Sequence, residues 1–545
     1  MQNVVADSIS DLVLTPVEQS LIDYVTRGQW LKLGTDDETV DETTMRSWDD
    51  ARSCSAVVIR EILRGRYAAN PDPHGVRLRR ARIVGRLDLE NLTTSVFLEL
   101  RECFLEEGIV ARDANMPGMA LLGCRLEHPT EPPLDADRLT CTSLVLQDAA
   151  INGHSEGGAV SLTGAHAGLF ACSGANLHND SGPALDARSM HVDQLLILTG
   201  LTAVGAGRDG AVNLSGAHVS GQLDCSRASL RNDSGPALDA NGIEVGQSLG
   251  LSDGFNAVGA GQDGAVNLIG AHVSGQLNCT RASLRNDSGP ALEASLLRVD
   301  QDLFLHDGFS AVGGGDGVAV DLTGVKVGGF FGLELAGPVR FMPRDRRIAV
   351  DGLAYAGVPS RVSPEEWLQL LRYGTNDYAA QPYQQLAAGY RALGDDRRVR
   401  QILISQRDDQ LARTHARLPE RLWGKITKVS LGYGYEPWRA LLFLVSVVVL
   451  SCSLAVALGS HGALTQTANT STPGRSCTFL QQVSVGLDLN LPVGTSLSRE
   501  GCGLARDSTS VTAAWLAAAD WMLQLLAWAF AALFLAGFTS AVRRT

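Results

Sequence analysis

One segment of this chain is repeated at intervals of 52 to 54 residues, and this repetition constrains the fold more than any other feature. GAVSLTGAH begins at Gly158, GAVNLSGAH at Gly210, GAVNLIGAH at Gly264 and the weaker GVAVDLTGV at Gly317. The segment NDSGPAL recurs in step with them and begins at Asn179, Asn232 and Asn286. Each long copy divides into two similar halves, because the sequence from Ala211 aligns with the sequence from Ala237. The elementary unit is therefore about half of the long repeat.

Each half contains two or three short strands in which apolar and polar residues alternate, separated by Gly, Asn, Asp or Ser. The apolar positions of one half are Val212, Leu214, Ala217, Val219, Leu223 and Cys225. One unit cannot cover its own apolar face, whereas units stacked at the usual strand separation of about 4.8 Å share a continuous core. We therefore predict a mainly β protein with a parallel right-handed β-helix over residues 76–350. Gly and Ala should occupy its tight inward corners, and NDSG turns with positive φ its outward corners.

Cys172, Cys225 and Cys279 occupy equivalent repeat positions and follow neither a CxxC nor a metal-ligand spacing. This pattern is typical of small buried residues in a reducing compartment. No charged and apolar leader opens the sequence, so we expect the N-terminal part to lie in the cytosol.

Helical signals flank the repeats and predict a cap at each end of the solenoid. In residues 1–75, Thr15 is expected as an N-cap, Pro16 as the first helical residue and Glu18 as the acid of a capping box. A second helix is predicted near residues 48–65. Such a cap covers the strand edge and apolar core that an open terminal coil would expose.

Residues 351–430 are predicted to form a helical hairpin and a linker. Ser363, Pro364 and Glu366 signal one helix start, and two amphipathic helices should follow, broken at Gly394 and Asp395. Their apolar faces are expected to pair Leu386, Tyr390 and Leu393 with Val399, Ile402 and Leu403. We interpret the hairpin as the C-terminal cap.

Residues 431–545 are predicted to form a membrane domain. Residues 440–458 and 521–542 contain no charged side chain and are long enough to cross a bilayer as two helices. Lys and Arg precede the first span and follow the second, so both flanks and the β-helix are expected on the cytoplasmic side of a multi-pass cell-membrane protein.

The loop of residues 459–512 between the spans would then be extracytoplasmic. It contains Cys477 and Cys502, and an oxidising exterior would allow a disulfide between them, with two free thiols as the alternative. Residues 479–494 form a short amphipathic stretch, and whether they re-enter the membrane is left open.

The formal net charge of -13 argues against a general nucleic-acid binder, because phosphate neutralisation needs clustered Lys and Arg, and no nucleic-acid partner is expected. No triad, paired-carboxylate site or P-loop is readable in the sequence. We therefore predict no catalytic, cofactor-binding or metal-binding residue, and no cofactor. The fragments AVGAGRDG from Ala203 and AVGAGQDG from Ala257 are interpreted as turns, because no helix follows them as a dinucleotide site requires.

Two sets of side chains recur on the predicted solenoid surface. His166, His218 and His272 share one repeat position, but they recur only in every second coil, about 10 Å apart, which is too far for one zinc ion. We interpret them as surface histidines. Arg227 and Arg281 belong to an outward stripe with Arg231 and Arg285, and the acids expected to neutralise it are Asp224, Asp233, Asp239 and Asp287.

Four segments carry a resemblance to a known family: LTPVEQSLIDYVTRGQW, RARIVGRLDLENL, PYQQLAAGYRALGDDRRVRQILI and GYGYEPWRALLFL. Together they resemble a bacterial family of pentapeptide-like β-helix proteins with a C-terminal membrane anchor, and the likeness covers nearly the whole chain. The family often carries the label membrane-associated oxidoreductase. The resemblance implies the solenoid-and-anchor architecture and, through that label, redox activity at a membrane.

Three functions remain open at this point. The first is a membrane-tethered scaffold that presents the repeated solenoid surface to an unidentified protein partner, with the lipid bilayer as its other partner. The second is the membrane-associated oxidoreductase that the resemblance implies. The third is a channel formed by a homo-oligomer of two-span subunits and gated by the solenoid.

Overall fold

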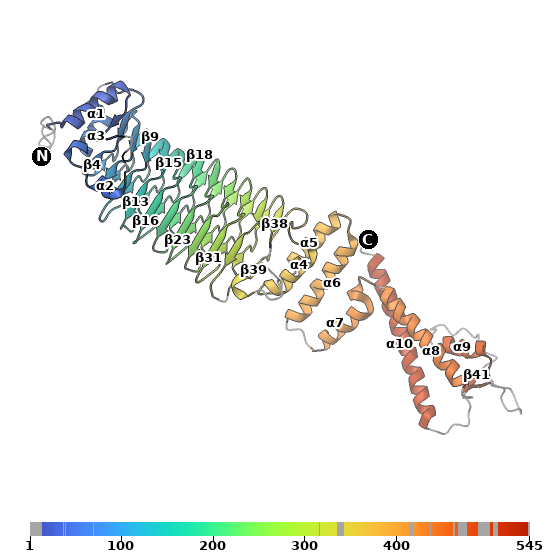
Figure 1. Cartoon of the computed structure of the whole chain (residues 1–545). Coiled ribbons are helices and arrows are strands. Elements are labelled where there is room, and N and C mark those ends of the chain that lie inside the picture. The colour runs from blue at the N-terminus through green and yellow to red at the C-terminus, as the bar shows by residue number, and fades with distance from the viewer. Residues whose placement is uncertain are drawn as a thin grey trace, which may run out of the picture. The chain divides into compact units, whose positions relative to one another are not determined.

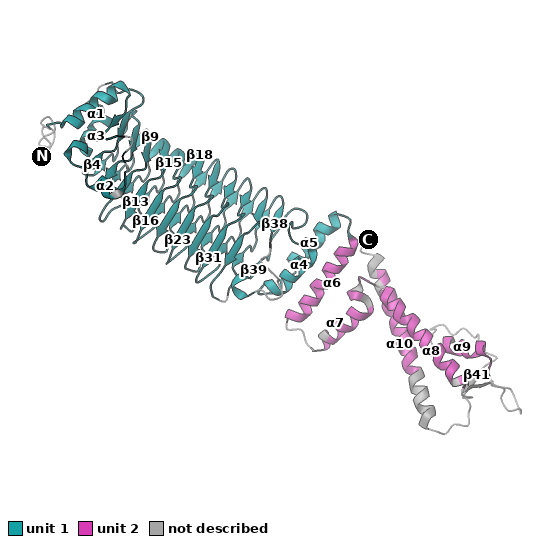
Figure 2. Ribbon diagram, viewed as in Figure 1, with its two compact units in different colours: residues 1–395 teal, residues 396–545 magenta. Residues whose placement is uncertain are grey.

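The chain consists of two compact units in the computed structural model, which we call the solenoid unit (Met1–Asp395) and the C-terminal unit (Asp396–Thr545; Figure 2). The structure describes residues 13–35, 38, 40–68, 70–315, 317–334, 343–414, 418–436, 438–460, 464–466, 477–488, 502–504 and 511–542.

The solenoid unit contains a parallel β-solenoid of about 11 turns, built from three sheets that run along its length (Figure 1). Each turn contributes to sheet A, then to sheet B, then to sheet C, and the register is parallel throughout. The predicted β-helix is confirmed in this respect, and two turns make up each long repeat. Sheet A has 17 strands and sheets B and C have 11 each, because several turns contribute two short strands to sheet A.

Sheet A comprises β1 (Leu31–Lys32), β3 (Val76–Arg79), β6 (Leu98–Arg101), β9 (Asn115–Leu122), β12 (Thr140–Val145), β15 (His166–Ala171), β18 (His191–Ile197), β21 (His218–Val219), β22 (Gln222–Asp224), β25 (Glu244–Val245), β26 (Leu249–Gly250), β29 (His272–Val273), β30 (Leu277–Asn278), β33 (Arg298–Val299), β34 (Leu303–Leu305), β37 (Lys326–Val327) and β38 (Phe331–Leu333). Sheet B comprises β2 (Ser53–Ser55), β4 (Arg82–Val84), β7 (Phe104–Leu105), β10 (Arg125–Glu127), β13 (Ala150–Gly153), β16 (Asn176–Asn179), β19 (Thr202–Gly205), β23 (Ser229–Asn232), β27 (Asn256–Gly259), β31 (Ser283–Asn286) and β35 (Ser310–Val312). Sheet C comprises β5 (Leu87–Asp88), β8 (Ile109–Val110), β11 (Leu134–Asp135), β14 (Val160–Ser161), β17 (Leu185–Asp186), β20 (Val212–Asn213), β24 (Leu238–Asp239), β28 (Val266–Asn267), β32 (Leu292–Glu293), β36 (Val320–Asp321) and β39 (Ile348–Ala349).

The interior of the solenoid is filled by the apolar residues that the alternating apolar and polar pattern of the sequence predicted to be buried. Val212, Leu214, Ala217, Val219 and Leu223 are all buried. Cys172, Cys225 and Cys279 are also buried and free, which confirms their interpretation as core residues. Burial raises the pKa of the Cys172 and Cys279 thiols to about 12, so both are neutral and unreactive in the fold.

The corners of the solenoid differ from the prediction in one respect. The NDSG turns contain no residue with positive φ, whereas the corners between sheets A and B and between sheets C and A do, and glycines such as Gly207 and Gly210 have positive φ at the B–C corners of other coils. Non-glycine residues take this conformation at several of these corners, including Arg227 (φ 61°) and Arg281 (φ 58°). At the NDSG corner the Asn side chain points inward instead, and Asn179, Asn232 and Asn286 are buried.

The glycines of the NDSG turns are needed because adjacent coils approach closely there. A Cβ atom at Gly182, Gly235 or Gly289 would lie 2.6 to 2.7 Å from a carbonyl oxygen of the preceding coil. The turn sequence recurs for this steric reason rather than for a positive φ.

Helices cover the N-terminal end of the solenoid: α1 (Pro16–Arg27), α2 (Glu42–Arg46), the 3-10 turn η1 (Asp50–Arg52) and α3 (Ala56–Leu63). The predicted start of α1 is confirmed, since the Thr15 and Glu18 side chains form a capping box and Pro16 is the first helical residue. The buried Glu18 carboxylate also accepts a hydrogen bond from Ser55 N at 2.9 Å. The second predicted helix is shorter than expected, because Ser53–Ser55 pair as a strand of sheet B.

The other end of the solenoid extends past the predicted limit at residue 350. Isolated β-bridges join Lys326 to Ala354 and Gly332 to Ser360. After the 3-10 turn η3 (Arg344–Arg346), the end is covered by α4 (Pro364–Gln369), the π-helical turn η4 (Leu370–Gly374) and α5 (Gln381–Ala392; Figure 1). The predicted capping box of Ser363 and Glu366 is confirmed.

The C-terminal unit begins with α6 (Asp396–Arg413), so the expected break between two helices at Gly394 and Asp395 is confirmed. Leu386, Tyr390, Val399 and Ile402 are buried, as the apolar pattern predicted. Leu393 is not, since its side chain is 65% exposed at the C-terminal end of α5.

The remaining elements of the C-terminal unit are α7 (Leu418–Leu431), the 3-10 turn η5 (Gly432–Gly434), α8 (Trp438–Ser460), β40 (Leu464–Gln466), α9 (Phe479–Asp488), β41 (Cys502–Leu504) and α10 (Val511–Val542). β40 and β41 pair antiparallel. α8 packs against α10 through stacked rings of Phe443 and Phe530, with centroids 5.3 Å apart, and against α9 where Gly486 lies over the Cys452 backbone.

Within the described residues, one helical segment is long and apolar enough to cross a membrane, Trp438–Ala457 of α8. The apolar stretch of α10, Trp521–Ala536, falls short of that length. The structure thus supports the first of the two predicted spans and leaves the second as a prediction.

Candidate functional site

A row of polar side chains runs along the exposed face of sheet A, one from each successive coil. The register aligns Thr140, His166, His191, His218, Glu244, His272, Arg298 and Lys326. We call this set the histidine row. His166, His218 and His272 occupy every second coil, as the repeat predicted. The sequence comparison missed His191, which fills the coil between His166 and His218. Imidazoles of adjacent coils therefore meet here, although His166 and His218 themselves lie two coils apart.

The three consecutive histidines are in direct ring contact. The ring centroids of His166 and His191 lie 4.8 Å apart with an edge-to-face angle of 84°. Those of His191 and His218 are also 4.8 Å apart, but the rings are stacked at 5°. This spacing matches the separation of adjacent parallel strands, so the backbone register itself holds the imidazoles together.

Asp193 lies two residues after His191 on the same face of β18 and accepts hydrogen bonds from two imidazoles. His166 Nε2 is 3.0 Å from Asp193 Oδ1, and His191 Nε2 is 3.2 Å from the same oxygen. The hydrogen bond from His166 is the main reason that the pKa of the Asp193 carboxyl lies below its usual value. All three side chains are about half exposed, so the group is open to solvent.

The other members of the row pair differently. His218 Nδ1 lies 3.1 Å from Glu244, and His272 Nε2 lies 2.9 Å from Asp300. Asp300 is shared with Arg298, whose Nε lies 3.2 Å away. His166, His218 and His272 are therefore all surface residues, as expected, but each has a different charged neighbour.

The predicted arginine stripe divides into two rows. Arg227 and Arg281 lie at the corner between sheets A and B, where Asp253 occupies the coil between them and lies 3.4 Å from Arg281 Nη1. Arg231 and Arg285 each pair with an acid two residues on, Asp233 and Asp287, as predicted. Asp224 and Asp239 do not belong to this stripe. Asp224 accepts hydrogen bonds from Ser226, and Asp239 is a half-buried residue of sheet C.

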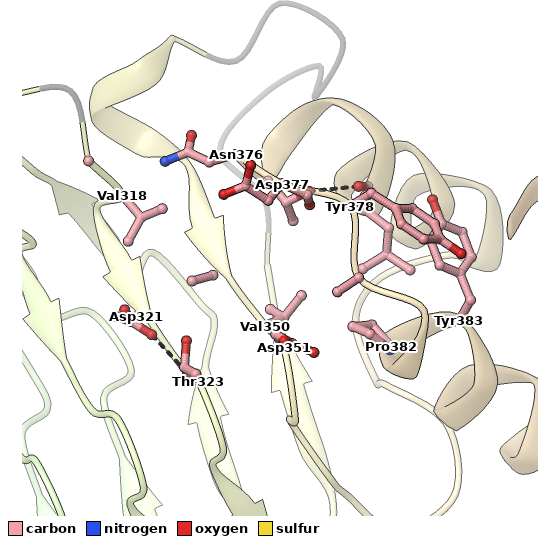
Figure 3. A pocket seen from close by; sticks show the side chains of 15 residues that line it. Val318, Asp321, Thr323, Val350, Asp351, Asn376, Asp377, Tyr378, Pro382 and Tyr383 are labelled. Atoms are coloured by element: carbon pink, nitrogen blue, oxygen red, sulfur yellow. Dashed lines mark hydrogen bonds between the residues drawn. The ribbon is translucent and has the colours of Figure 1, made fainter. Parts of the chain in front are cut away.

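A pocket of about 400 Å³ lies at the C-terminal end of the solenoid, a volume in the usual range for a small ligand (Figure 3). Asp321 and Thr323 line it from the last coils, and Tyr378, Pro382 and Tyr383 line it from the capping segment (Figure 3). Among the described residues, its lining includes the carboxylates of Asp321, Asp351 and Asp377 and no Lys or Arg. This charge disfavours a phosphate-bearing cofactor and favours a cationic or neutral guest.

The glycine-rich fragments form strand and turn. Ala203 lies in β19 and Ala257 in β27, and each fragment leads into a strand of sheet C rather than a helix. The expected absence of a following helix is confirmed, but only the second part of each fragment is a turn, because its first residues belong to a strand.

The predicted disulfide is only partly described. Cys477 is disulfide-bonded, while the side chain of Cys502 lies outside the described residues. Pairing of these two cysteines stays a prediction. Residues 489–494, the second half of the stretch considered for membrane re-entry, also lie outside the described residues.

Fold and surface together define a capped parallel β-solenoid with a histidine row on one face, followed by a helical unit that contains an apolar helix long enough to cross a membrane. No family model, curated protein or solved structure matches the chain.

Proposed function

We propose that this protein is a scaffold tethered to the cell membrane, in which the C-terminal unit binds the bilayer and the solenoid presents its repeated surface to a protein partner in the cytoplasm. The observation that carries the proposal is the apolar helix α8. Its segment Trp438–Ala457 is long enough to span a bilayer, and its side chains are largely exposed, unlike those of a core helix.

The helix that precedes α8 supports the same proposal. α7 exposes Leu422, Trp423, Ile426 and Val429. Their spacing places them on one side of the helix, while Gly424 on the opposite side is buried next to Leu411 of α6. An exposed apolar face with a Trp and with Lys425 beside it is typical of a helix that lies in the membrane interface.

We propose that α10 forms a second span beside α8, which gives the multi-pass anchor that the family resemblance implies. The ring stacking of Phe443 on Phe530 supports an α8–α10 pair. Lys425 and Lys428 precede α8 and Arg439 lies in its first turn, so the positive-inside rule assigns this side, and the solenoid with it, to the cytoplasm.

The tether is tested by membrane fractionation of the full-length chain. We expect the protein to remain in the membrane pellet after alkaline carbonate extraction. The double variant Val445→Arg/Val449→Arg should leave the pellet, because two charges on one exposed face of α8 oppose insertion by about 2.5–3 kcal/mol each. Val84→Arg, a matched control at an exposed position of β4, should fractionate like the wild type. A wild-type chain that is extracted by carbonate would contradict the proposal.

The scaffold role is tested by shortening the solenoid without disturbing its ends. Deletion of residues 210–263 removes one long repeat and joins Asp209 to Gly264, which restores the native Asp-Gly sequence at the junction. Proximity labelling in cells should lose specific neighbours in this variant while membrane attachment is retained. An unchanged set of labelled proteins would argue against a partner on the repeated surface.

A further inference from the structure

We propose that His166, His191 and Asp193 form a binding site for one divalent transition-metal ion, with zinc as the ion that fits best. Each side chain offers one ligand atom, and these atoms all lie within 4.8 Å of one another. The site goes beyond the scaffold function and does not depend on it.

The geometry is already close to that of a tetrahedral zinc site. Ligands at about 2.0–2.1 Å from a tetrahedral ion are about 3.3 Å from each other. Asp193 Oδ1 lies 3.0 Å from His166 Nε2 and 3.2 Å from His191 Nε2, so two of the three ligand–ligand distances are near this value. Only the distance between the two nitrogens has to adjust, and the side chains are exposed enough to allow it.

The donor set is also the one that zinc prefers. Two imidazole nitrogens and one carboxylate oxygen suit zinc, whereas magnesium and calcium favour oxygen ligands. Three protein ligands leave one coordination position for water. In the ion's absence the two N–H groups point at the Asp193 carboxylate, and zinc would take the place of these protons.

The strand register brings the carboxylate beside the imidazole of the preceding coil, as it also does for Asp300 and His272. The pairing of β15 with β18 shifts register between Ala167 and Leu169, so β18 has one extra residue opposite Gly168. Asp193 follows directly after Val192, the last residue before the shift, and reaches the His166 imidazole of the preceding coil.

The histidine row contains a built-in control. His272 also bonds a carboxylate, Asp300, but its neighbours in the row are Glu244 and Arg298 rather than histidines. Arg298 shares Asp300 and would repel a cation there. His218 stacks on His191, but its Nδ1 is engaged by Glu244, so we do not include it among the ligands.

The experiment is zinc titration of the purified full-length chain in detergent, carrying a tag without histidines, against a chelating indicator dye. We expect one high-affinity zinc per chain in the wild type and in His272→Ala. His166→Ala and His191→Ala should each raise the dissociation constant at least tenfold, since even outer-shell partners of metal ligands contribute about 10–100-fold. Cobalt substitution gives a second readout, because an absorption spectrum typical of tetrahedral coordination should appear in the wild type and weaken in His191→Ala.

Three results would overturn the proposal. One is a wild-type chain without zinc affinity above that of His191→Ala. Another is an equal loss in His272→Ala, which would indicate unspecific binding by surface histidines. A third is a cobalt spectrum unchanged by His191→Ala. Circular dichroism of each variant checks the fold, and His191→Gln serves as a second variant that keeps the size of the side chain while removing the imidazole.

Discussion

At the scale of single residues, the buried asparagines of the NDSG turns show how polar groups hold the coils together. Asn232 Nδ2 donates to the Gly207 carbonyl of the preceding coil at 3.0 Å, and its Oδ1 accepts from Ser234 N and Gly235 N. Asn286 Nδ2 makes the equivalent bond to Gly261 O at 2.9 Å. Each amide thus satisfies backbone groups at a corner where no strand pairing is available.

We expect Asn232→Ala to destabilise the solenoid unit by about 1–3 kcal/mol, because it leaves buried backbone groups without partners. Chemical denaturation followed by circular dichroism measures the change. Asp233→Ala is the control: this neighbouring side chain is exposed and forms only a surface ion pair with Arg231, so the effect should stay within about 0.5 kcal/mol. Equal effects of the two substitutions would contradict the inward role of the asparagine.

The sequence predicted the positions of such residues better than their conformations. The recurrence of NDSG located the corner, but composition alone suggested positive φ, whereas the glycine is required by the carbonyl of the adjacent coil. His191 was missed for a related reason. Comparison of whole long repeats aligns His166 with His218, and the coil between them belongs to the other, more divergent half. The signal that could have found it is alignment at the half-repeat, where His191 follows His166 by one coil.

At the scale of elements, sheet C carries a second row of polar side chains, in which carboxylates alternate with neutral amides. Asp186, Asn213, Asp239, Asn267 and Glu293 lie on consecutive strands in register. An amide separates each carboxylate from the next over this stretch, which keeps like charges about two strand spacings apart. Burial raises the pKa of the Asp239 carboxyl above its usual value.

This shift predicts a pH-dependent effect of Asp239→Asn. Because the pKa of Asp239 is higher in the folded chain than in the unfolded one, its ionised form at neutral pH weakens folding. The amide variant removes this cost and keeps an acceptor for Asn241 N. We expect a higher Tm than the wild type at pH 7, and a difference that shrinks as the pH falls through the folded-state pKa and vanishes below about 3.8. Thermal unfolding over this pH range provides the test, and a gap that does not change with pH would contradict it.

At the scale of the whole chain, the sequence predicted the order of parts because each has its own periodicity: short alternating strands, amphipathic helices and long apolar runs. The boundaries were harder to predict. Ala354 and Ser360 still pair with the solenoid although the repeat has faded, because a backbone can continue a coil without the repeat sequence. The second span stays a prediction, because the apolar stretch of α10 in the described residues, Trp521–Ala536, is shorter than a membrane-crossing helix needs.

The C-terminal end of the solenoid unit is closed by aromatic packing. The ring centroid of Trp367 in α4 lies 5.9 Å from that of Phe331 in β38, the last strand of sheet A. It lies 6.2 Å from the ring centroid of Tyr355. Two glutamines of α5 cover the backbone of the last coil, since Gln381 donates to Leu353 O and Gln385 to Tyr355 O. The cap therefore covers the apolar core and also the backbone hydrogen-bonding groups of the last coil, to which another chain could otherwise bind.

We expect Trp367→Ala to open this end and so to change how the whole molecule behaves. Trp367 is fully buried, and its loss should cost about 3–5 kcal/mol of unfolding free energy. The exposed coil should then pair with other copies, because its strand edge and core are the natural continuation of the stack. Light scattering in detergent should show association that increases with concentration. Trp423→Ala, a matched change at an exposed residue of α7, should leave both the unfolding free energy of the solenoid unit and its association unchanged. If Trp367→Ala lowers stability without association, the strand edge is protected by the α5 glutamines alone, and the aromatic cluster acts only as core.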